Sequence, residues 1–276
     1  MFKDITILIK TFEREDALRR LLDSIRKKGL DCPILIADDS REPYKDAILD
    51  TYGDLVTEYV VLPFNSGVSK GRNVLLDRVQ TKYFLLNDDD FAYEERTDLQ
   101  WMREQLEAND LDLLSATVFE RDDYAHPDAK WPRLKKAKRL LESFWKGPQE
   151  VVGRFQCVFE VEGDVIVRRE IPYTPPITRC DYSYQFFLAN TEAVREKVGG
   201  WDEDLKAFGE HWEFFYRAKK GGLRVAATEE TGIRHYPARN QVYDSFRFDR
   251  EEYYKNLSLS KHGFTSMRNE HLSVPA

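Results

Sequence analysis

Short runs of apolar residues alternate with amphipathic segments over the first ninety residues. Residues 5–9, 33–37, 56–62 and 83–86 form apolar runs of the length and composition that are typical of buried strands. Between the first two runs, residues 16–28 repeat leucine and isoleucine at helical spacing. Because strand and helix alternate, the pattern predicts a mainly parallel sheet with right-handed crossovers.

Acidic residues follow two of these predicted strands. Asp38 and Asp39 come after the run at 33–37, and Asp88, Asp89 and Asp90 come after the run at 83–86. The carboxyl ends of parallel strands meet at one edge of a sheet, where open α/β sheets bind ligands. Asp88 and Asp90 would project to the same side of an extended chain and offer a divalent cation two oxygen ligands. The alternative is a solvated loop, or a cap for a helix that begins near residue 94.

A loop with glycines and cations precedes the next predicted helix. Gly67, Lys70, Gly71 and Arg72 lie within residues 63–73. Such an entry to a helix can bind anions through backbone amides and side-chain charge, although most turns that contain glycine bind nothing. Acidic and basic candidates both follow strands, so we expect them to share one rim of the sheet.

Composition narrows the class of protein without defining its function. The 276 residues are 42% hydrophobic, enough for one large α/β domain or two small ones. A net charge of -7 argues against a general affinity for nucleic acid. Cys32, Cys157 and Cys180 lack metal-ligand spacing, which favours a reducing compartment over a disulfide framework. Without a visible signal peptide or long apolar stretch, the sequence leads us to expect a cytoplasmic protein, either free or peripheral to a membrane.

The motifs and their order resemble those of the nucleotide-sugar glycosyltransferases of the GT-A fold, in particular family 2. The segments that carry this resemblance are Lys10-Thr11-Phe12-Glu13-Arg14, Ala37-Asp38-Asp39-Ser40, Asn65-x-Gly67 with Arg72-Asn73, and Asn87-Asp88-Asp89-Asp90 as the DxD element. The second half is similar to the ganglioside-type β-1,4-N-acetylgalactosaminyltransferases. The segments there are Asp181 to Ala189, Val194-Arg195-Glu196 and His211 to Phe215.

The resemblance covers about residues 5–236 and implies a domain organisation. It implies an α/β, Rossmann-like GT-A fold, with a mainly parallel central sheet, helices on both faces and a small antiparallel insertion. The expected ranges are a domain at 1–240, its nucleotide-binding half at 1–92, its acceptor half at 93–240, an insertion at about 124–179 and a C-terminal aromatic and basic extension at 241–276.

The resemblance also implies a reaction and a donor site. The reaction is inverting, metal-dependent transfer of GalNAc or a related sugar from a UDP-sugar to a hydroxyl of a glycan or glycolipid. The implied donor-binding residues are Thr11, Arg14, Asp38, Asp39, Asn65, Gly67, Arg72, Asn73, Asp88 and Asp89. The implied metal ligands are Asp90, His235 and Asp88. The ion would be Mn²⁺ or Mg²⁺, and the imidazole favours Mn²⁺. Such a metal neutralises charge on the UDP leaving group.

The predicted helix from residue 210 to 220 carries the candidates for a general base. Where family 2 usually has an aspartate as base, this chain has His211. His211 and Glu213 both suit general-base work, and Glu213 is preferred because an anion also stabilises an oxocarbenium-like centre. Helix-start and capping roles are the alternative for both residues. The implied acceptor-binding residues are Asp181, Trp201 and Glu210.

Three stretches outside the main motifs leave alternatives open. The basic stretch from Lys130 to Arg139 suits either an anionic membrane surface or a solvated helix face. Residues 151–171 alternate apolar and polar positions, which predicts an antiparallel hairpin with its turn near Gly163. Residues 243–262 suit a helix or a flap over the donor.

Two other functions remain compatible with the sequence. One is a nucleotidyltransferase that acts on a sugar phosphate, because it would also use a nucleotide and a metal. The other is a catalytically silent subunit that binds a nucleotide or a carbohydrate. No nucleic-acid partner is expected.

Overall fold

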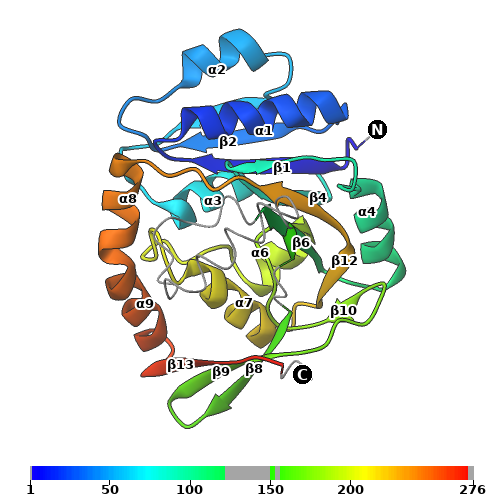
Figure 1. Ribbon diagram of the computed structural model, residues 1–276, viewed down its shortest axis with the longest axis vertical. Helices are drawn as coiled ribbons and strands as arrows, with labels where there is room; N and C mark the ends of the chain where they lie inside the picture. Colours follow the sequence, from blue (N-terminus) through cyan, green and yellow to red (C-terminus); the bar gives the residue numbers. More distant parts are fainter. Residues whose placement is uncertain (1, 122–149, 153–155, 273–276) are drawn as a thin grey trace, which may run out of the picture.

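The computed structural model describes residues 2–121, 150–152 and 156–272. Over these residues, ten strands form one central sheet in the order β10-β12-β6-β11-β4-β1-β2-β3, with β5 paired to β12 and β7 paired to β6 (Figure 1). The strands are β1 (Ile5–Thr11), β2 (Ile34–Asp38), β3 (Glu58–Val61), β4 (Tyr83–Asp88), β5 (Phe91–Ala92), β6 (Leu113–Arg121), β7 (Glu150–Val152), β10 (Thr178–Arg179), β11 (Phe187–Asn190) and β12 (Val225–His235).

The amino-terminal half of the sheet is parallel, as the sequence predicts. Strands β4, β1, β2 and β3 run in one direction, and Ile9 of β1 lies between Ile36 of β2 and Asn87 of β4. Strand β11 is antiparallel to both β4 and β6, whereas β12 is parallel to β6. The carboxyl ends of β1, β2 and β4 therefore meet at one edge of the sheet.

Helices cover both faces of the sheet, which confirms the predicted α/β architecture. The helices are α1 (Glu15–Lys28), α2 (Lys45–Tyr52), α3 (Val68–Leu76), α4 (Leu99–Ala108), α6 (Thr191–Lys197), α7 (Glu210–Lys220), α8 (Gln241–Arg247), η2 (Phe248–Arg250) and α9 (Glu251–Ser260). Ile7 and Ile9 of β1 pack in one hydrophobic core with α1 and α4, and Leu8 packs in the other with α3 and α7. Because both faces are buried, the strand is apolar at successive positions.

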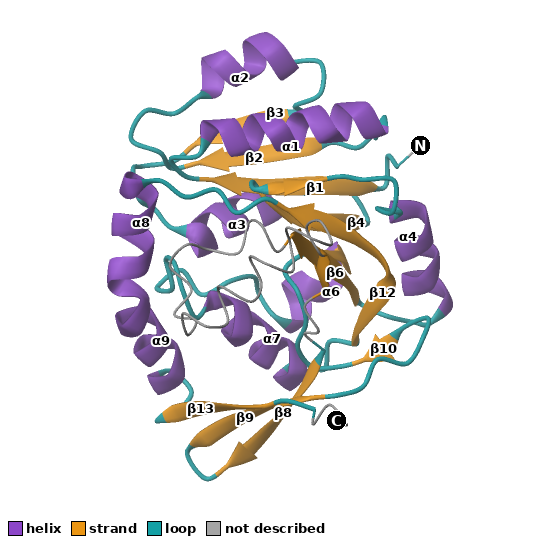
Figure 2. Ribbon diagram, in the orientation of Figure 1, coloured by secondary structure: helices purple, strands orange, loops and turns teal. Residues whose placement is uncertain are grey.

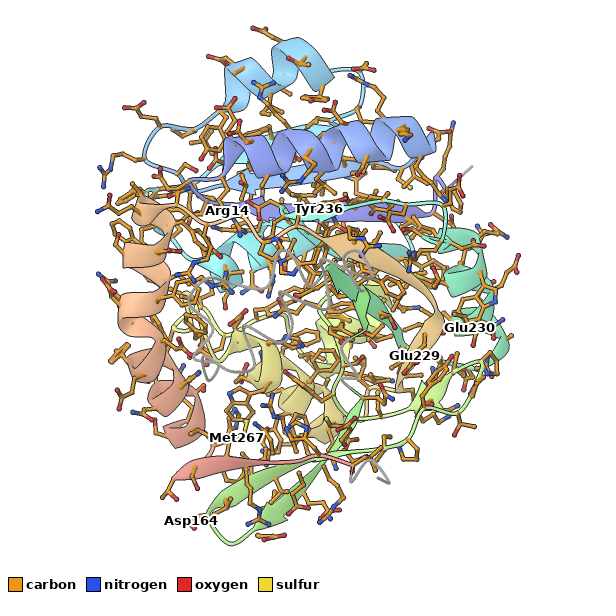
Figure 3. The ribbon with its side chains drawn as sticks, in the orientation of Figure 1. Arg14, Asp164, Glu229, Glu230, Tyr236 and Met267 are labelled. Carbon is orange, nitrogen blue, oxygen red and sulfur yellow. The ribbon has the colours of Figure 1, made fainter. Side chains whose placement is uncertain are left out.

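A second, smaller sheet lies at the far end of the molecule (Figure 2). Its strands β8 (Cys157–Glu162) and β9 (Val165–Glu170) form the predicted antiparallel hairpin, with Gly163 at positive φ in the turn. Strand β13 (Ser266–Glu270) comes from the end of the chain and pairs with β9 in parallel. Figure 3 shows Asp164 in the hairpin turn and Met267 on β13. The hairpin is therefore completed by a distant part of the sequence.

The C-terminal extension forms helices rather than a loop. In Figure 1, α8 and α9 lie along one side of the molecule. Phe246 of α8 contacts Phe12 and Phe64 at ring distances of 5.8 and 5.1 Å. These contacts join the extension to the loops that follow β1 and β3.

The structure does not test the predicted contact of the basic stretch with a membrane. The basic stretch from Lys130 to Arg139 lies outside the described residues. Within the residues that are described, none of the helices is both long enough and apolar enough for a membrane span.

Candidate active site

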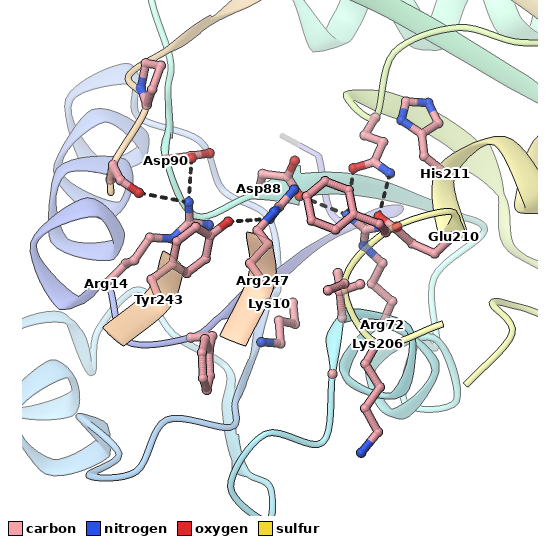
Figure 4. A pocket seen from close by; sticks show the side chains of 18 of the residues that line it. Lys10, Arg14, Arg72, Asp88, Asp90, Lys206, Glu210, His211, Tyr243 and Arg247 are labelled. Atoms are coloured by element: carbon pink, nitrogen blue, oxygen red, sulfur yellow. Dashed lines mark hydrogen bonds and ion pairs between the residues drawn. The ribbon is translucent and has the colours of Figure 1, made fainter. Parts of the chain in front are cut away.

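A cavity of about 400 Å³ lies at the carboxyl edge of β1, β2 and β4. The start of α7, the end of β12 and helix α8 complete its wall, and Figure 4 shows charged side chains from these elements around it. The predicted site residues on the wall are Arg14, Asp39, Asn65, Gly67, Arg72, Asp88, Asp90, Glu210, His211 and His235. Segments that are more than two hundred residues apart thus contribute to one cavity.

Asp39 holds the glycine-containing loop against the sheet. Its carboxylate accepts a hydrogen bond from the amide of Gly67 at 2.7 Å and pairs with the ammonium of Lys10. Its backbone oxygen accepts from the amide of Asn65 at 3.0 Å. Gly67 has a φ of 99°, and a Cβ atom there would lie 2.7 Å from the Cβ of Lys206. The close approach requires glycine, and the loop is fixed at the rim.

Asp38 and Thr11 do not reach the cavity, which corrects the expectation that both bind the donor. Asp38 is fully buried and accepts hydrogen bonds from the amides of Ser40 and Tyr44 and from the hydroxyl of Tyr59. The hydroxyl of Thr11 is also buried and donates to Asp89 at 2.8 Å. Both side chains are fully occupied within the fold.

Arg14 joins the two last residues of the acidic triplet. Its guanidinium pairs with Asp89 and, at 2.7 Å, with Asp90, and it lies 4.2 Å from the ring centre of Tyr243. Asp89 is fully buried and does not line the cavity, so its expected contact with the donor is also corrected. Burial raises the pKa of Asp89 to about 6. Burial opposes ionisation of Asp90 too, but Arg14 and His235 outweigh it and lower the pKa of Asp90.

Asp90 and His235 meet across the cavity wall. Nε2 of His235 lies 3.3 Å from Asp90, and Nδ1 lies 2.6 Å from Glu120. Burial disfavours the imidazolium, but the two carboxylates outweigh it and raise the pKa of His235 to about 10. The sequence separates Asp90 from His235 by 145 positions, and the sheet brings them together because His235 ends β12, paired with Phe91 of β5.

Two of the three expected metal ligands, Asp90 and His235, lie next to each other. In the part of the chain that the structure describes, no cluster of three or more His, Cys, Asp or Glu side chains is arranged to hold a metal ion. Asp88 instead pairs with Arg72 at 3.0 Å. A carboxylate and an imidazole that face one cavity nevertheless fit a divalent cation such as Mn²⁺, whose remaining ligands would come from phosphate and water.

Arg72 lies at the centre of a buried polar network. Its guanidinium is 2% exposed and contacts Asp88 at 3.0 Å, Gln185 at 2.9 Å and Glu210 at 3.5 Å. The amide of Gln185 in turn donates to Glu210 at 3.2 Å. The network orients the Glu210 carboxylate toward the cavity.

Helix α7 begins at the cavity and brings Glu210 and His211 to its wall. Gly209 precedes the helix with a φ of 84°. Nε2 of His211 lies 2.6 Å from the carbonyl oxygen of Ser183, and since a carbonyl only accepts, this nitrogen carries the proton. Burial lowers the pKa of His211 to about 3, so the ring is neutral near pH 7.

Glu213 is turned away from the cavity, so the preferred general base of the sequence does not fit the structure. Its carboxylate is 1% exposed and accepts hydrogen bonds from Arg217 at 2.6 and 2.9 Å. His262 lies 3.1 Å away. Glu213 lies one turn after Glu210 on nearly the same face of α7, but only Glu210 lines the cavity. Glu213 is therefore held by Arg217 and His262 away from the residues that line the cavity.

Three other predicted site residues join elements instead of lining the cavity. Trp201 is 4% exposed and stacks on Phe214 at 4.8 Å. Asn73 exchanges two hydrogen bonds with the backbone of Trp201. Asp181 accepts from the amide of Phe159 at 2.8 Å and from Lys219 at 2.6 Å, which ties the hairpin to α7. These contacts explain the three residues within the fold, and their contacts with donor or acceptor stay predictions.

Several residues on the wall have no role in the predictions from sequence. Four of them are Lys10, Gln185, Lys206 and Arg247. Lys10 and Gln185 lie inside segments that carry the family resemblance, so the motifs around them could have identified both as site residues. Arg247 lies in the aromatic and basic extension, whose position relative to the sheet no local pattern reveals.

An α/β sheet with a charged cavity at its carboxyl edge is typical of proteins that bind a ligand at the strand ends. Comparison with known proteins makes the assignment narrower. The chain belongs to glycosyl transferase family 2, whose model matches residues 6–171. The chain is therefore a glycosyltransferase domain, and the predicted GT-A fold is confirmed.

Curated relatives share this assignment over most of the chain. It is 33% identical over 231 residues to β-1,4 N-acetylgalactosaminyltransferase 1 of Rattus norvegicus, covering 84% of this chain and 38% of the rat protein. It is 40% identical over 253 residues to β-1,4 N-acetylgalactosaminyltransferase 2 of Mus musculus, covering 88% of this chain and 43% of the mouse protein. The chain thus spans about two fifths of the length of the curated relatives it matches.

Solved structures show the same fold at low sequence identity. S. aureus TarS 1-349 aligns with a TM-score of 0.57 at 15% identity, over 84% of this chain and 60% of that one. TarS 1-349 in complex with UDP-GlcNAc aligns with a TM-score of 0.59 at 15% identity, over 86% and 60%. At this identity the likeness concerns the fold alone.

Proposed function

We propose that this domain transfers an N-acetylhexosamine, or a related hexose, from a UDP-sugar to a hydroxyl of a glycan or glycolipid, with inversion and with a divalent cation. The observation that carries the proposal is the meeting of Asp90 and His235 in the cavity that also holds Glu210 and His211. The names of the curated relatives support an N-acetylgalactosaminyl group, and the UDP-GlcNAc complex of TarS supports a UDP-sugar donor.

The donor would lie along the carboxyl edge of the sheet. Asp39, Asn65 and Phe12 line the cavity, and we expect them to contact the uridine. Arg72, Asp88 and Asp90 also line the cavity, and the phosphates and the sugar would lie beside them. Asp90 and His235 would hold Mn²⁺ or Mg²⁺, which offsets the charge that UDP gains as it leaves.

Glu210 is the general base that this geometry favours. A single displacement needs one group that takes the proton of the acceptor hydroxyl. His211 keeps a proton on Nε2 toward Ser183, and the low pKa of its ring makes Nδ1 a weak base near pH 7. Glu210 is a carboxylate on the cavity wall, oriented by Gln185 and Arg72. His211 remains the alternative base, and Glu213 is withdrawn from this role.

Thermal unfolding with candidate donors tests the proposal directly. UDP-GalNAc, UDP-GlcNAc, UDP-Gal and UDP-Glc are each added with Mn²⁺, and the matching sugar should raise Tm most, since a ligand that binds only the native state stabilises it. Asp90→Asn should remove the part of the shift that depends on Mn²⁺, whereas Asp54→Asn, at an exposed position, should keep it. An unchanged Mn²⁺ effect in Asp90→Asn would refute the metal site.

The same assay separates the two other candidate functions. Protection by a nucleoside triphosphate with a sugar phosphate, and not by UDP-sugars, would favour a nucleotidyltransferase. Protection by UDP-sugars without release of UDP, over a broad acceptor panel, would favour a silent binding subunit. Partners on the acceptor side, including lipid-linked glycans and a membrane surface, stay part of the proposal.

A further inference from the structure

Arg247 brings a positive charge from the C-terminal extension into the cavity. It is the last residue of α8, and Figure 4 places it between Arg14 and Asp90 on one side and Arg72 and Glu210 on the other. The charges of Asp88 and Glu210 both act on its guanidinium. The family match ends at residue 171, so Arg247 lies outside the segment that defines the family.

Three other cations on the cavity wall are paired with carboxylates. Lys10 pairs with Asp39, Arg14 with Asp89 and Asp90, and Arg72 with Asp88. A buried charge without such a partner is costly, because the protein replaces little of its hydration. Pairing therefore explains how these cations are tolerated in the absence of a ligand.

Arg247 has a different environment. Among the described residues, it forms no ion pair with a carboxylate within 4 Å, and its hydrogen bond goes to the neutral hydroxyl of Tyr243. The rings of Phe208 and Tyr243 lie 5.2 and 5.4 Å from its guanidinium. Guanidinium stays protonated in proteins, so a full positive charge faces the cavity with aromatic and hydroxyl neighbours.

The position of α8 is fixed by contacts with the donor side of the sheet. Phe246 packs on Phe12 and Phe64, and the ring of Tyr243 lies 4.2 Å from Arg14. The amide of Asn240 donates to the backbone oxygen of Glu13 at 2.6 Å. These contacts hold the helix against the loops that follow β1 and β3. The guanidinium of Arg247 is therefore positioned by a packed helix.

We propose that Arg247 binds the diphosphate of the donor, so that the C-terminal helix α8 completes the donor site from outside the family match. The inference rests on the proposed UDP-sugar function. Planar guanidinium matches phosphate oxygens with two parallel hydrogen bonds. From its place between Asp90 and Glu210, Arg247 reaches the side of the phosphates that the metal pair does not occupy, and it stabilises the leaving UDP as charge develops.

Affinities for UDP and for uridine, measured by calorimetry with Mn²⁺ on the full chain, test this assignment. Arg247→Gln should weaken UDP binding about 10- to 100-fold and leave uridine binding unchanged, since a charged hydrogen bond to phosphate is lost. Arg247→Lys should recover part of the UDP affinity because it retains the charge. Arg250→Gln, an exposed position three residues further on, is the matched control and should bind UDP as the unmodified chain does.

The outcomes distinguish the inference from the function on which it rests. Unchanged UDP affinity in Arg247→Gln, while the unmodified chain binds UDP, overturns the inference and leaves the proposed function standing. Equal losses of UDP and uridine binding in both Arg247 variants, together with a lower Tm, assign Arg247 a structural role and also overturn it. If the unmodified chain binds no UDP with any metal, the proposed function fails and the inference fails with it.

Discussion

Two glutamates on α7 show how strongly position decides the chemistry of a residue. Glu210 faces the cavity beside Gln185, and Glu213 lies one turn later in a closed network with Arg217 and His262. Both residues are nearly buried, at 5% and 1% exposure. The first carboxylate can accept a proton from a ligand, whereas the second stabilises the helix to which it belongs.

Substituting each glutamate by glutamine should therefore have opposite effects. Glu210→Gln should lower the transfer rate by roughly 10²- to 10⁴-fold and leave UDP affinity within a few-fold, because it removes the general base. Glu213→Gln should lower stability by about 2–3 kcal/mol with transfer largely kept, because it weakens charged hydrogen bonds. Single-turnover rates and denaturant unfolding measure the two effects. Normal transfer by Glu210→Gln would eliminate it as the base.

The His211 ring predicts how stability depends on pH. Its pKa falls from about 6.5 in the unfolded chain to about 3 in the fold, so the unfolded chain binds more protons between these values. The stability that the neutral ring contributes is complete above pH 6.5. It is lost as pH falls toward 3, by at most about 1.4 kcal/mol per pH unit.

Urea unfolding from pH 7 to pH 4 checks this contribution against His211→Asn. Asparagine can donate to the oxygen of Ser183 and does not titrate, so the variant should lose less stability on acidification than the unmodified chain. Equal slopes for the two proteins would show that the ring is accessible to protons in the fold.

At the scale of elements, the turn before α3 depends on one close backbone approach. Gly67 combines positive φ with a Cβ position 2.7 and 2.8 Å from two atoms of Lys206. Gly163, in the β8–β9 turn, also has positive φ but has no atom within 4 Å of its Cβ position. Comparing the two glycines therefore separates the energetic cost of the backbone conformation from the cost of steric crowding at Cβ.

Alanine at each position should cost different amounts of stability. Gly163→Ala should cost about 1 kcal/mol, for backbone strain alone. Gly67→Ala should cost roughly 2 kcal/mol more, because the methyl group displaces Lys206, and it should also weaken UDP binding as the rim shifts. Denaturant midpoints and UDP titrations measure both. Equal costs at the two sites would show that the loop relaxes freely.

At the scale of the whole molecule, the end of the chain has two separate tasks. Tyr243, Phe246, Arg247 and Phe248 line the cavity, and β13 closes the small sheet beside β9. Met267 of β13 packs against the core beneath the hairpin (Figure 3). One part of the extension thus lines the cavity, and the next part completes the small sheet.

Deleting residues 266–276 should separate these tasks. Stability should fall by about 1–2 kcal/mol, as a partly buried methionine and an edge strand are lost, and Tm by roughly 2–6 °C. UDP affinity should be unchanged, because every wall residue precedes the deletion. Scanning calorimetry and UDP titration provide the readouts. A loss of UDP affinity would indicate that the small sheet also positions α8.

Local pattern was enough to predict much of the fold and part of the site. Apolar runs and helical spacing depend on neighbours in the sequence, so β1, α1 and the β8–β9 hairpin could be predicted. The site was predicted less well. Asp38 and Asp39 are adjacent and of one residue type, yet Asp38 caps a turn and Asp39 lines the cavity.

The sequence by itself determined the alternation of strands and helices, the rim at which the acids gather and the family to which the chain belongs. Only the tertiary structure decided which carboxylates reach the cavity, that Asp90 meets His235, and that Arg247 arrives from the C-terminal extension. Periodicity specifies which face of an element is buried. It does not specify which distant element covers that face, because this depends on packing between segments that are far apart in the chain.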